Sequence, residues 1–143
     1  NGKRMREGTM DRTVIYARTA CPNEAELNWQ VQVLRGLAAE LNLNATHIIR
    51  ETASGLNFER QGLRELMGLV KAHEVDTILM KDLARIGRDI PKVIDVLEEL
   101  NKYGITLIIQ GGDTVETSNP LCTLLRRFTP HPGLEVVLAS PTE

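Results

Sequence analysis

Four arginines in this chain are placed where they could bind phosphate. They are Arg18, Arg60, Arg85 and Arg88. Arg18 and Arg85 each follow an apolar run typical of a strand, and Gly87 lies between Arg85 and Arg88. The guanidinium is always charged, planar and forked, so it can bind two phosphate oxygens at once. Several converging guanidiniums can stabilise the charge of a phosphoryl-transfer transition state without a metal ion.

Ion pairing is the simpler interpretation for any one of these arginines. The acidic residues near them in the sequence are Glu51, Glu59, Asp82 and Asp89. An exposed arginine commonly pairs with such a carboxylate at the surface, with little effect on stability. For four arginines at one edge of a domain, with a glycine between two of them, a phosphate site is the favoured interpretation.

The hydrophobic pattern predicts the elements that must position these arginines. Short runs rich in Ile and Val predict strands at residues 13–17, 46–51, 75–80 and 105–109. Apolar residues three and four apart predict helices at about 23–41 and 60–73, and a third from Asp89 to just before Gly104. Alternating strands and helices predict an α/β fold: a mostly parallel four- to five-stranded sheet with helices on both faces. The carboxyl ends of parallel strands then share one edge, where such sheets bind ligands.

The ends and faces of these helices carry further information. The side chains of Asn23 and Asp89 can cap the first turns of two helices, and Gly104 is typical of the residue that follows a helix. Trp29 and Val33 lie beside the apolar stripe of the first helix. They either widen that stripe or cover a partner surface.

The pattern weakens beyond residue 112. It allows a short helix at 119–128 and a fifth strand at 134–139, separated by Pro130 and Pro132. We therefore divide the chain into an N-terminal tail (1–12), one domain (13–128) and a C-terminal tail or short strand (129–143).

The composition is that of one globular domain rather than a dedicated DNA-binding module. The chain has 143 residues, 42% hydrophobic and 25% charged, with a formal net charge of −2, whereas such modules are normally strongly basic. No run approaches the roughly 20 apolar residues of a membrane span, and the N-terminus is polar, so we predict a cytoplasmic protein without a membrane partner. Cys21 and Cys122 are expected to be reduced thiols. The three histidines lack metal-ligand spacing, so we predict no metal site.

Several short motifs resemble the catalytic domain of the serine recombinases, the resolvase and invertase family. They span about residues 13–113 and occur in the order that the family has. The matching segments are Tyr16-x-Arg18, Gln30, residues 51–55, Arg60-x-Gly62-Leu63, residues 83–89, residues 104–107 and Asp113-Thr114. Each match is weak alone, but together they are specific, and residues 83–89 are the most distinctive.

The resemblance implies site-specific DNA recombination, as carried out by mobile genetic elements. In that family a serine hydroxyl attacks a DNA phosphate, which gives a 5′-phosphoserine link and a free 3′ hydroxyl. Four subunits cut and rejoin two duplexes, and no metal or nucleotide cofactor is used. The implied partners are DNA and further copies of the chain, as a homodimer or tetramer.

The resemblance also assigns roles to individual residues. Arg18, Arg85 and Arg88 would hold the scissile phosphate. The site would be supported by Ser54, Arg60 and Gln30. Glu51 takes the place of an acidic residue that is usually aspartate.

The family's nucleophile is missing from this chain. Its position is occupied by Ala20, whose methyl group cannot attack phosphorus. Ala84 replaces an aspartate, and Thr19 and Cys21 also differ from the family pattern, so we interpret Ala20 as natural divergence. We predict that the chain does not cleave DNA, and whether it is an enzyme at all stays open at this point.

Cys21 is a possible surrogate nucleophile, because a thiolate near arginines would be reactive. However, side chains alternate along a strand, so Arg18 and Ala20 share a face while Cys21 points the other way. Pro22 also restricts the backbone of Cys21. A partly buried free cysteine is the favoured interpretation.

Two functions of other classes stay open. One is a non-catalytic oligomerisation or regulatory module derived from a recombinase. The other is a flavodoxin-like domain that binds a small phosphorylated ligand. In the serine recombinases a long helix and DNA-binding segments follow the catalytic domain. Pro130 and Pro132 would end such a helix, so we expect either a fragment or a chain that has lost this region.

Overall fold

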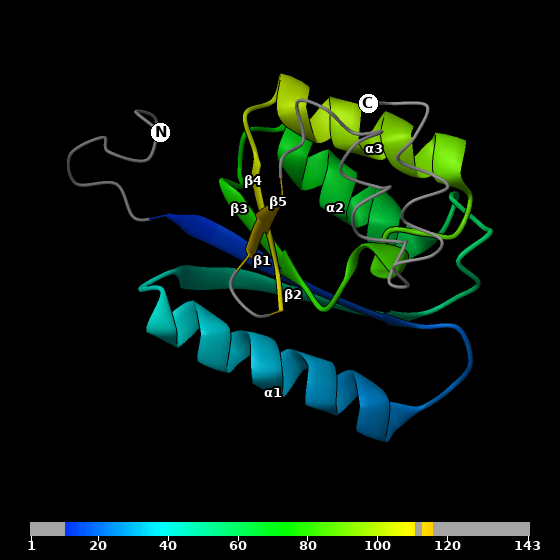
Figure 1. Cartoon of the computed structure of the whole chain (residues 1–143), viewed down its shortest axis with the longest axis horizontal. Coiled ribbons are helices and arrows are strands. Elements are labelled where there is room, and N and C mark those ends of the chain that lie inside the picture. Colours follow the sequence, from blue (N-terminus) through cyan, green and yellow to red (C-terminus); the bar gives the residue numbers. More distant parts are fainter. Residues whose placement is uncertain (1–10, 111–112, 116–143) are drawn as a thin grey trace, which may run out of the picture.

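The computed structural model describes residues 11–110 and 113–115, which form an α/β domain (Figure 1). Its strands are β1 (Arg12–Thr19), β2 (Asn44–Thr52), β3 (Thr77–Met80), β4 (Thr106–Ile109) and β5 (Asp113–Val115). Its helices are α1 (Glu24–Glu40), α2 (Gln61–Lys71) and α3 (Ile90–Lys102), with a short 3-10 helix, η2 (Leu83–Arg85), after β3. The predicted α/β class is confirmed.

The five strands form one sheet in the order β2-β1-β3-β4-β5. The first four are parallel, and only β5 runs antiparallel to its neighbour β4. In the centre of the sheet, Ile15 of β1 lies between Ile48 of β2 and Leu79 of β3. The mostly parallel sheet is therefore confirmed, with its fifth strand at residues 113–115. The helix predicted at 119–128 and the strand predicted at 134–139 lie outside the described residues.

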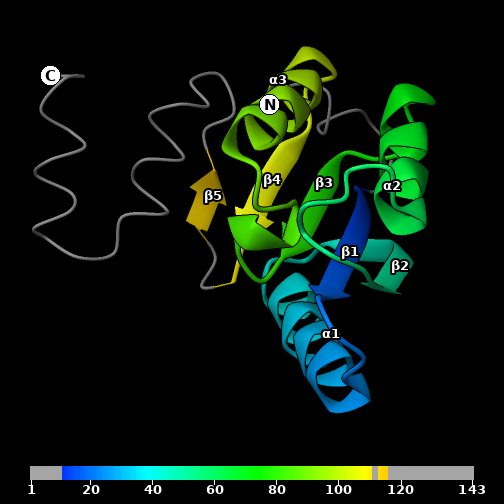
Figure 2. The same ribbon diagram turned by 90° about the vertical axis from the view of Figure 1, so that its right-hand side faces the viewer.

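Helices cover both faces of the sheet, as predicted. Helix α1 lies on one face, and α2 and α3 lie on the other (Figures 1 and 2). Ile15 and Leu79 pack against Leu34 and Ala38 of α1. The opposite core contains alternate residues of the same strands together with residues of α2 and α3, among them Val14, Tyr16, Ile78, Met80, Leu66 and Leu97. Strands buried on both faces explain the continuous apolar runs in the sequence.

The predicted helix ends are confirmed. Asn23 accepts a hydrogen bond from the Glu26 N–H at 3.0 Å, and Asp89 accepts one from the Lys92 N–H at 3.4 Å. Gly104 follows α3 with a φ of 68°, a conformation that favours glycine. Local sequence is sufficient to define these boundaries, because each cap involves residues only a few positions apart.

The structure differs from the predictions in strand boundaries and in one short element. Strand β3 begins at Thr77 rather than at residue 75, and the preceding Asp76 places its carboxylate 3.0 Å from the Arg12 backbone nitrogen. Helix η2 was not predicted, because a three-residue turn has no hydrophobic period to detect. Among the described residues, no helix is long and apolar enough to cross a membrane.

Candidate active site

The loops that follow β1, β2 and β3 meet at the carboxyl edge of the sheet. Two backbone hydrogen bonds join them. Ala53 N–H donates to the Thr19 carbonyl at 3.0 Å, and Arg88 N–H donates to the Gly55 carbonyl at 2.8 Å. This arrangement brings together the four arginines noted in the sequence, although they lie in segments up to 70 residues apart (Arg18 to Arg88).

Arg18 lies at the centre of this edge and is buried, with 1% of its surface exposed. Its guanidinium donates to three backbone carbonyls, at Ala53 (2.8 Å), Ala84 (2.6 Å) and Arg85 (3.0 Å). Burial lowers the pKa of Arg18, and the charges of Arg60 and Arg85 lower it further. Arg18 therefore braces the loops after β2 and β3 from inside.

Arg60 is also buried, and its guanidinium forms a polar cluster with Tyr16 and Glu51. Its Nε donates to a Glu51 carboxylate oxygen at 3.0 Å, and its Nη2 donates to the hydroxyl of Tyr16 at 2.9 Å. The Tyr16 hydroxyl donates in turn to Glu51. Nη2 of Arg60 also reaches the carbonyls of Arg85 (2.8 Å) and Ile86 (2.6 Å). Burial raises the pKa of Tyr16, and the hydrogen bond to Glu51 adds to this effect.

Tyr16 is a site residue that sequence reasoning used only as part of a motif. The signal for it was the strand alternation that places Tyr16 and Arg18 on one face of β1. Glu51 completes the cluster with its second oxygen, which accepts the Gly62 N–H at 2.8 Å. A Cβ added at Gly62 would lie 2.5 Å from the Glu51 carboxyl carbon, so only glycine permits this approach.

Gln30 of α1 is buried against the backbone of Arg18. Its Oε1 accepts the Arg18 N–H at 3.2 Å, and its Nε2 donates to the Arg18 carbonyl at 3.0 Å and to Glu26 at 3.1 Å. Gln30 thus holds the end of β1 from the face opposite to Arg60. Desolvation raises the pKa of Glu26, but hydrogen bonds from Lys81 and Gln30 together with the charges of Lys81 and Arg85 outweigh it, so the pKa is lowered.

Arg85 and Arg88 lie nearer the surface. Arg85 donates to the Arg18 carbonyl at 2.7 Å and pairs with Asp82 at 3.1 Å, and 15% of its side chain is exposed. Arg88 is exposed, and within the described part of the chain its guanidinium has no hydrogen-bond or ion-pair partner. Of the four arginines, Arg88 is the most accessible to a ligand.

The ion pairs considered from the sequence are present for two of the four arginines. Arg60 pairs with Glu51 and Arg85 pairs with Asp82. Within residues 11–110 and 113–115, Arg18 and Arg88 have no carboxylate partner. The edge therefore carries more positive than negative charge.

The residues that follow β1 are exposed. They are Ala20 and Cys21. Cys21 is a free thiol and is not partly buried, so that part of the prediction was wrong, because the chain leaves the sheet one residue earlier at Ala20. Ser54 is exposed as well, and its hydroxyl accepts the Leu56 N–H at 3.1 Å, which stabilises the turn of its own loop.

Phe58 links the loop after β2 to the segment that carries Arg85 and Arg88. A Cβ added at Gly87 would lie 2.1 Å from the edge of the Phe58 ring, so the ring packs directly on the glycine backbone. The guanidinium of Arg60 lies 5.5 Å from the centre of the same ring. This close contact explains why residue 87, between Arg85 and Arg88, is a glycine.

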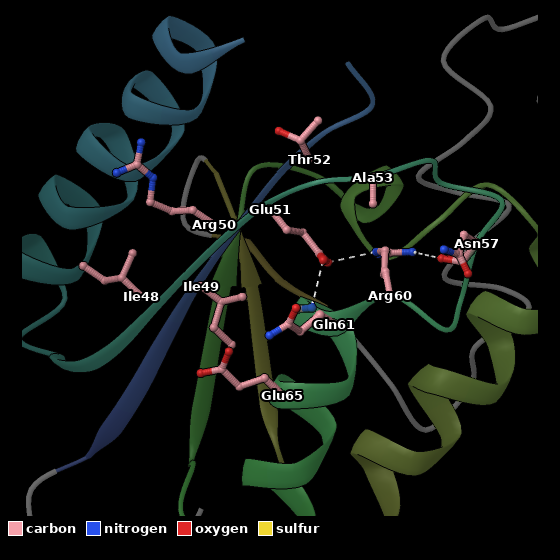
Figure 3. Close-up of a pocket in the computed structure, with 11 residues that line it drawn as sticks. Ile48, Ile49, Arg50, Glu51, Thr52, Ala53, Asn57, Arg60, Gln61 and Glu65 are labelled. Atoms are coloured by element: carbon pink, nitrogen blue, oxygen red, sulfur yellow. Dashed lines mark hydrogen bonds and ion pairs between the residues drawn. The ribbon is translucent and has the colours of Figure 1, made fainter. Parts of the chain in front are cut away.

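A pocket of about 640 Å³ lies beside the cluster, between the end of β2 and the start of α2 (Figure 3). Glu51 and Arg60 form part of its wall and are joined by an ion pair, whereas Arg50 points away toward α1. Arg18, Arg85 and Arg88 do not line this pocket. Of the four arginines, only Arg60 borders this pocket. No group of metal-ligating side chains occurs in the described part of the chain.

The family of this chain follows from a direct comparison. Residues 13–129 match the model of the resolvase N-terminal domain. The chain belongs to the resolvase family. Over 92 residues it is 35% identical to a resolvase/recombinase of Pseudomonas putida and 32% identical to the transposon Tn3 resolvase of Escherichia coli. These matches cover 64% of this chain but only 47% and 46% of the two relatives, so the chain spans about half the length of the resolvases it matches.

Solved structures share the resolvase-type fold. The C-terminal catalytic domain of ISC1926 TnpA, an IS607-like serine recombinase, superposes with a TM-score of 0.66 at 23% identity, over 92% of this chain and 96% of that one. The N-terminal catalytic domain of TP901-1 integrase superposes with a TM-score of 0.71 at 17% identity, over 92% and 97%. At these identities the likeness shows that the fold is that of serine recombinase catalytic domains.

Proposed function

We propose that this chain is a serine-recombinase-like domain for site-specific DNA recombination in which the strand-cleaving step is lost. One observation carries the proposal: the arginine cluster is assembled, while Ala20, two residues after Arg18, has no nucleophilic atom. The cluster supports phosphate binding at the edge of the sheet. Cleavage by the family's route needs an oxygen at position 20.

The outer arginines are the proposed phosphate ligands. Arg88 is exposed and Arg85 is partly exposed, so both can reach a DNA backbone without unfolding of the loop. Arg18 and Arg60 act as positioning residues, because their guanidiniums hold the carbonyls of residues 84–86. The inner pair thus fixes the backbone that carries the outer pair.

Electrostatics supports an anionic ligand at this edge. The described residues supply no carboxylate partner for Arg18 or Arg88, and the pKa of Arg18 is lowered first by burial and then by the charges of the neighbouring arginines. A bound phosphate would reduce this repulsion. Forked donors at Arg85 and Arg88 suit the geometry of its oxygens.

The proposed loss of cleavage follows from the chemistry of the resolvase reaction. There the serine oxygen forms a bond to phosphorus, and the bond from phosphorus to the 3′ oxygen breaks to leave a 3′ hydroxyl. Ala20 supplies no oxygen for the new bond. Ala84, in place of an aspartate, also removes a carboxylate from the segment that Arg18 contacts.

A trapping experiment tests the proposal. Supercoiled DNA carrying a resolvase-family recombination site is incubated with the native chain, with Ala84→Asp and with the double variant Ala20→Ser/Ala84→Asp. We expect a covalent protein–DNA adduct only with the double variant, and mapped to position 20. An adduct formed by the native chain at Cys21 or Ser54 would show that cleavage is not lost.

A regulatory module is the second candidate, and one observation favours it. The chain keeps the fold and the arginine cluster although Ala20 stands at the position of the family's attacking serine. Such a chain would form mixed oligomers with active recombinases and inhibit them. Light scattering should then detect dimers or tetramers, and a strictly monomeric chain that does not associate with an active recombinase would exclude this role.

A further inference from the structure

Lys92 is an exposed cation beside one of the proposed phosphate ligands. It lies in the first turn of α3, four positions after Arg88. Asp89 caps this turn by accepting the Lys92 backbone N–H at 3.4 Å. Glu59 and Asp95 line the same pocket between α2 and α3 as Lys92. Within the described residues, neither these carboxylates nor any other forms an ion pair with Lys92, so its ammonium is free to meet an anion.

The position of Lys92 is unfavourable for the stability of α3. The amino end of a helix carries partial positive charge, so a cation in the first turn is repelled and a cation in the last turn is attracted. Beyond the cap, the first turn of α3 holds no acidic residue, whereas Lys102 lies in the last turn. Helix stability therefore explains Lys102 but not Lys92. A residue that breaks such a local rule is a candidate for a functional role.

Phe58 anchors Lys92 beside the segment that carries Arg88. The Lys92 ammonium lies 5.8 Å from the centre of the Phe58 ring, a cation–π contact. The same half-buried ring packs on the backbone of Gly87, the residue before Arg88. The Arg88 N–H in turn donates to the Gly55 carbonyl at 2.8 Å. The loop after β2 thus holds both Arg88 and Lys92 near the junction between η2 and α3.

Three lysines among the described residues lie over aromatic rings, and Lys92 differs from the other two. Lys81 lies 4.9 Å from the centre of the Trp29 ring, but an ion pair with a glutamate of α1 already neutralises its ammonium. Lys102 lies 5.9 Å from the centre of the Tyr103 ring, at the carboxyl end of α3. Of the three, only Lys92 combines an ammonium free of ion pairs with a place next to the proposed phosphate site.

We propose that Lys92 binds a backbone phosphate of duplex DNA, next to the phosphate bound by Arg88. The inference rests on the proposed function, which places a duplex at this edge of the sheet. Each strand of a duplex presents a phosphate about every 3.4 Å along the helix axis, so two cations at one junction can meet neighbouring phosphates. Such contacts orient the duplex without reading its sequence. Lys92 therefore adds affinity and orientation, and it takes no part in the chemistry.

Salt-dependent binding tests this role of Lys92. A fluorescein-labelled duplex with a resolvase-family recombination site is titrated with the protein at several salt concentrations while anisotropy is followed. Lys92→Ala should weaken binding by about three- to tenfold at about 0.1 M salt and reduce the slope of log affinity against log salt concentration by about one. Lys92→Arg, which keeps the charge, should restore both. Lys102→Ala is the matched control and should change neither, since it removes a ring-bound lysine from the far end of the same helix.

Two further measurements separate a phosphate contact from other roles of Lys92. A labelled duplex of unrelated sequence should lose affinity for Lys92→Ala by the same factor, because a phosphate contact carries no sequence information. Thermal unfolding should show no appreciable loss of stability for Lys92→Ala, since the side chain is exposed and is repelled by the helix dipole. Weaker binding by this variant then reports a lost contact rather than a damaged fold.

Arg88→Ala distinguishes failure of this inference from failure of the proposed function. If Arg88→Ala reduces the salt slope and Lys92→Ala does not, the proposed function stands and Lys92 is not a phosphate ligand. If Lys92→Ala weakens binding only to the recombination site, the side chain reads bases, and the phosphate assignment is overturned. If Lys92→Ala lowers the mass measured by light scattering and leaves DNA binding unchanged, Lys92 contacts another copy of the chain instead. If the native chain binds neither duplex at low salt, both proposals fail.

Discussion

The inner and outer arginines of the candidate site are the same residue type in two different environments. Arg18 and Arg60 are 1% and 3% exposed, and their donors point at backbone carbonyls and at Tyr16 and Glu51. Arg85 and Arg88 lie toward solvent, and Arg88 has its guanidinium free of partners among the described residues. The difference shows that burial separates two roles of arginine here. A buried guanidinium holds the loops together, and an exposed guanidinium is available to a ligand.

The largest expected effect comes from removing an inner arginine. Arg60→Ala should lower the free energy of unfolding by roughly 3–5 kcal/mol, because the enclosed carboxylate of Glu51 would lose its charge partner. Urea unfolding followed by circular dichroism measures this loss. The matched control is Arg88→Ala, which should stay within about 0.5 kcal/mol of the native chain. Equal losses in the two variants would break the comparison between inner and outer arginines.

A smaller effect on stability is expected at Gly87, where Phe58 of the loop after β2 packs against the segment that carries Arg85 and Arg88. Gly87→Ala should cost about 1–3 kcal/mol, because the new methyl group would overlap the Phe58 ring. Gly36→Ala in α1 is the control, since an added Cβ there meets no atom within 4 Å, and it should raise stability by about 0.5–1 kcal/mol. Thermal or urea unfolding compares the two. If Gly87→Ala were as stable as Gly36→Ala, Phe58 would not hold Gly87 in place.

The buried phenol of Tyr16 should make the free energy of unfolding depend on pH in the alkaline range. The pKa of Tyr16 is raised in the folded state, so its contribution to stability is complete below the unfolded pKa near 10 and is lost as pH rises above it. Over that interval the free energy of unfolding should fall by up to about 1.4 kcal/mol per pH unit. Urea unfolding between about pH 9 and 11 measures the slope. Tyr16→Phe should remove the part of this slope that comes from ionisation of Tyr16. An identical slope in both proteins would contradict the burial of the phenol.

The smallest change in stability is expected at the surface, together with a clear change in binding. Arg88→Ala should leave unfolding unchanged within about 0.5 kcal/mol. It should weaken DNA binding and reduce by about one the slope of log affinity against log salt concentration, as expected for the loss of one phosphate contact. Anisotropy titrations at several salt concentrations measure both quantities. Substitution of Lys71, exposed at the end of α2, provides a control cation that should leave the slope unchanged.

Much of the fold could be predicted because its signals are local. The caps at Asn23 and Asp89 and the glycine after α3 were each recognisable from a few neighbouring residues. The buried strands produced apolar runs, and alternation with helices implied a parallel sheet. Strand β5 was not foreseen, because three residues carry too little pattern to mark a strand. The role of Phe58 was missed for another reason: its partner Gly87 lies 29 positions away, so no local pattern connects them.

The sequence by itself determined the order of the elements, the placement of arginines after strands, the resolvase family and the alanine at position 20. Only the tertiary structure decided which arginines are enclosed and which remain open, and that the ring of Phe58 contacts both Gly87 and Lys92. The physical reason is the range of the interactions. Hydrophobic period and capping act over a few residues, whereas Arg18 finds its carbonyl partners at Ala53 and Ala84, which lie 35 and 66 positions away. Such hydrogen bonds exist only once the sheet has brought its loops together.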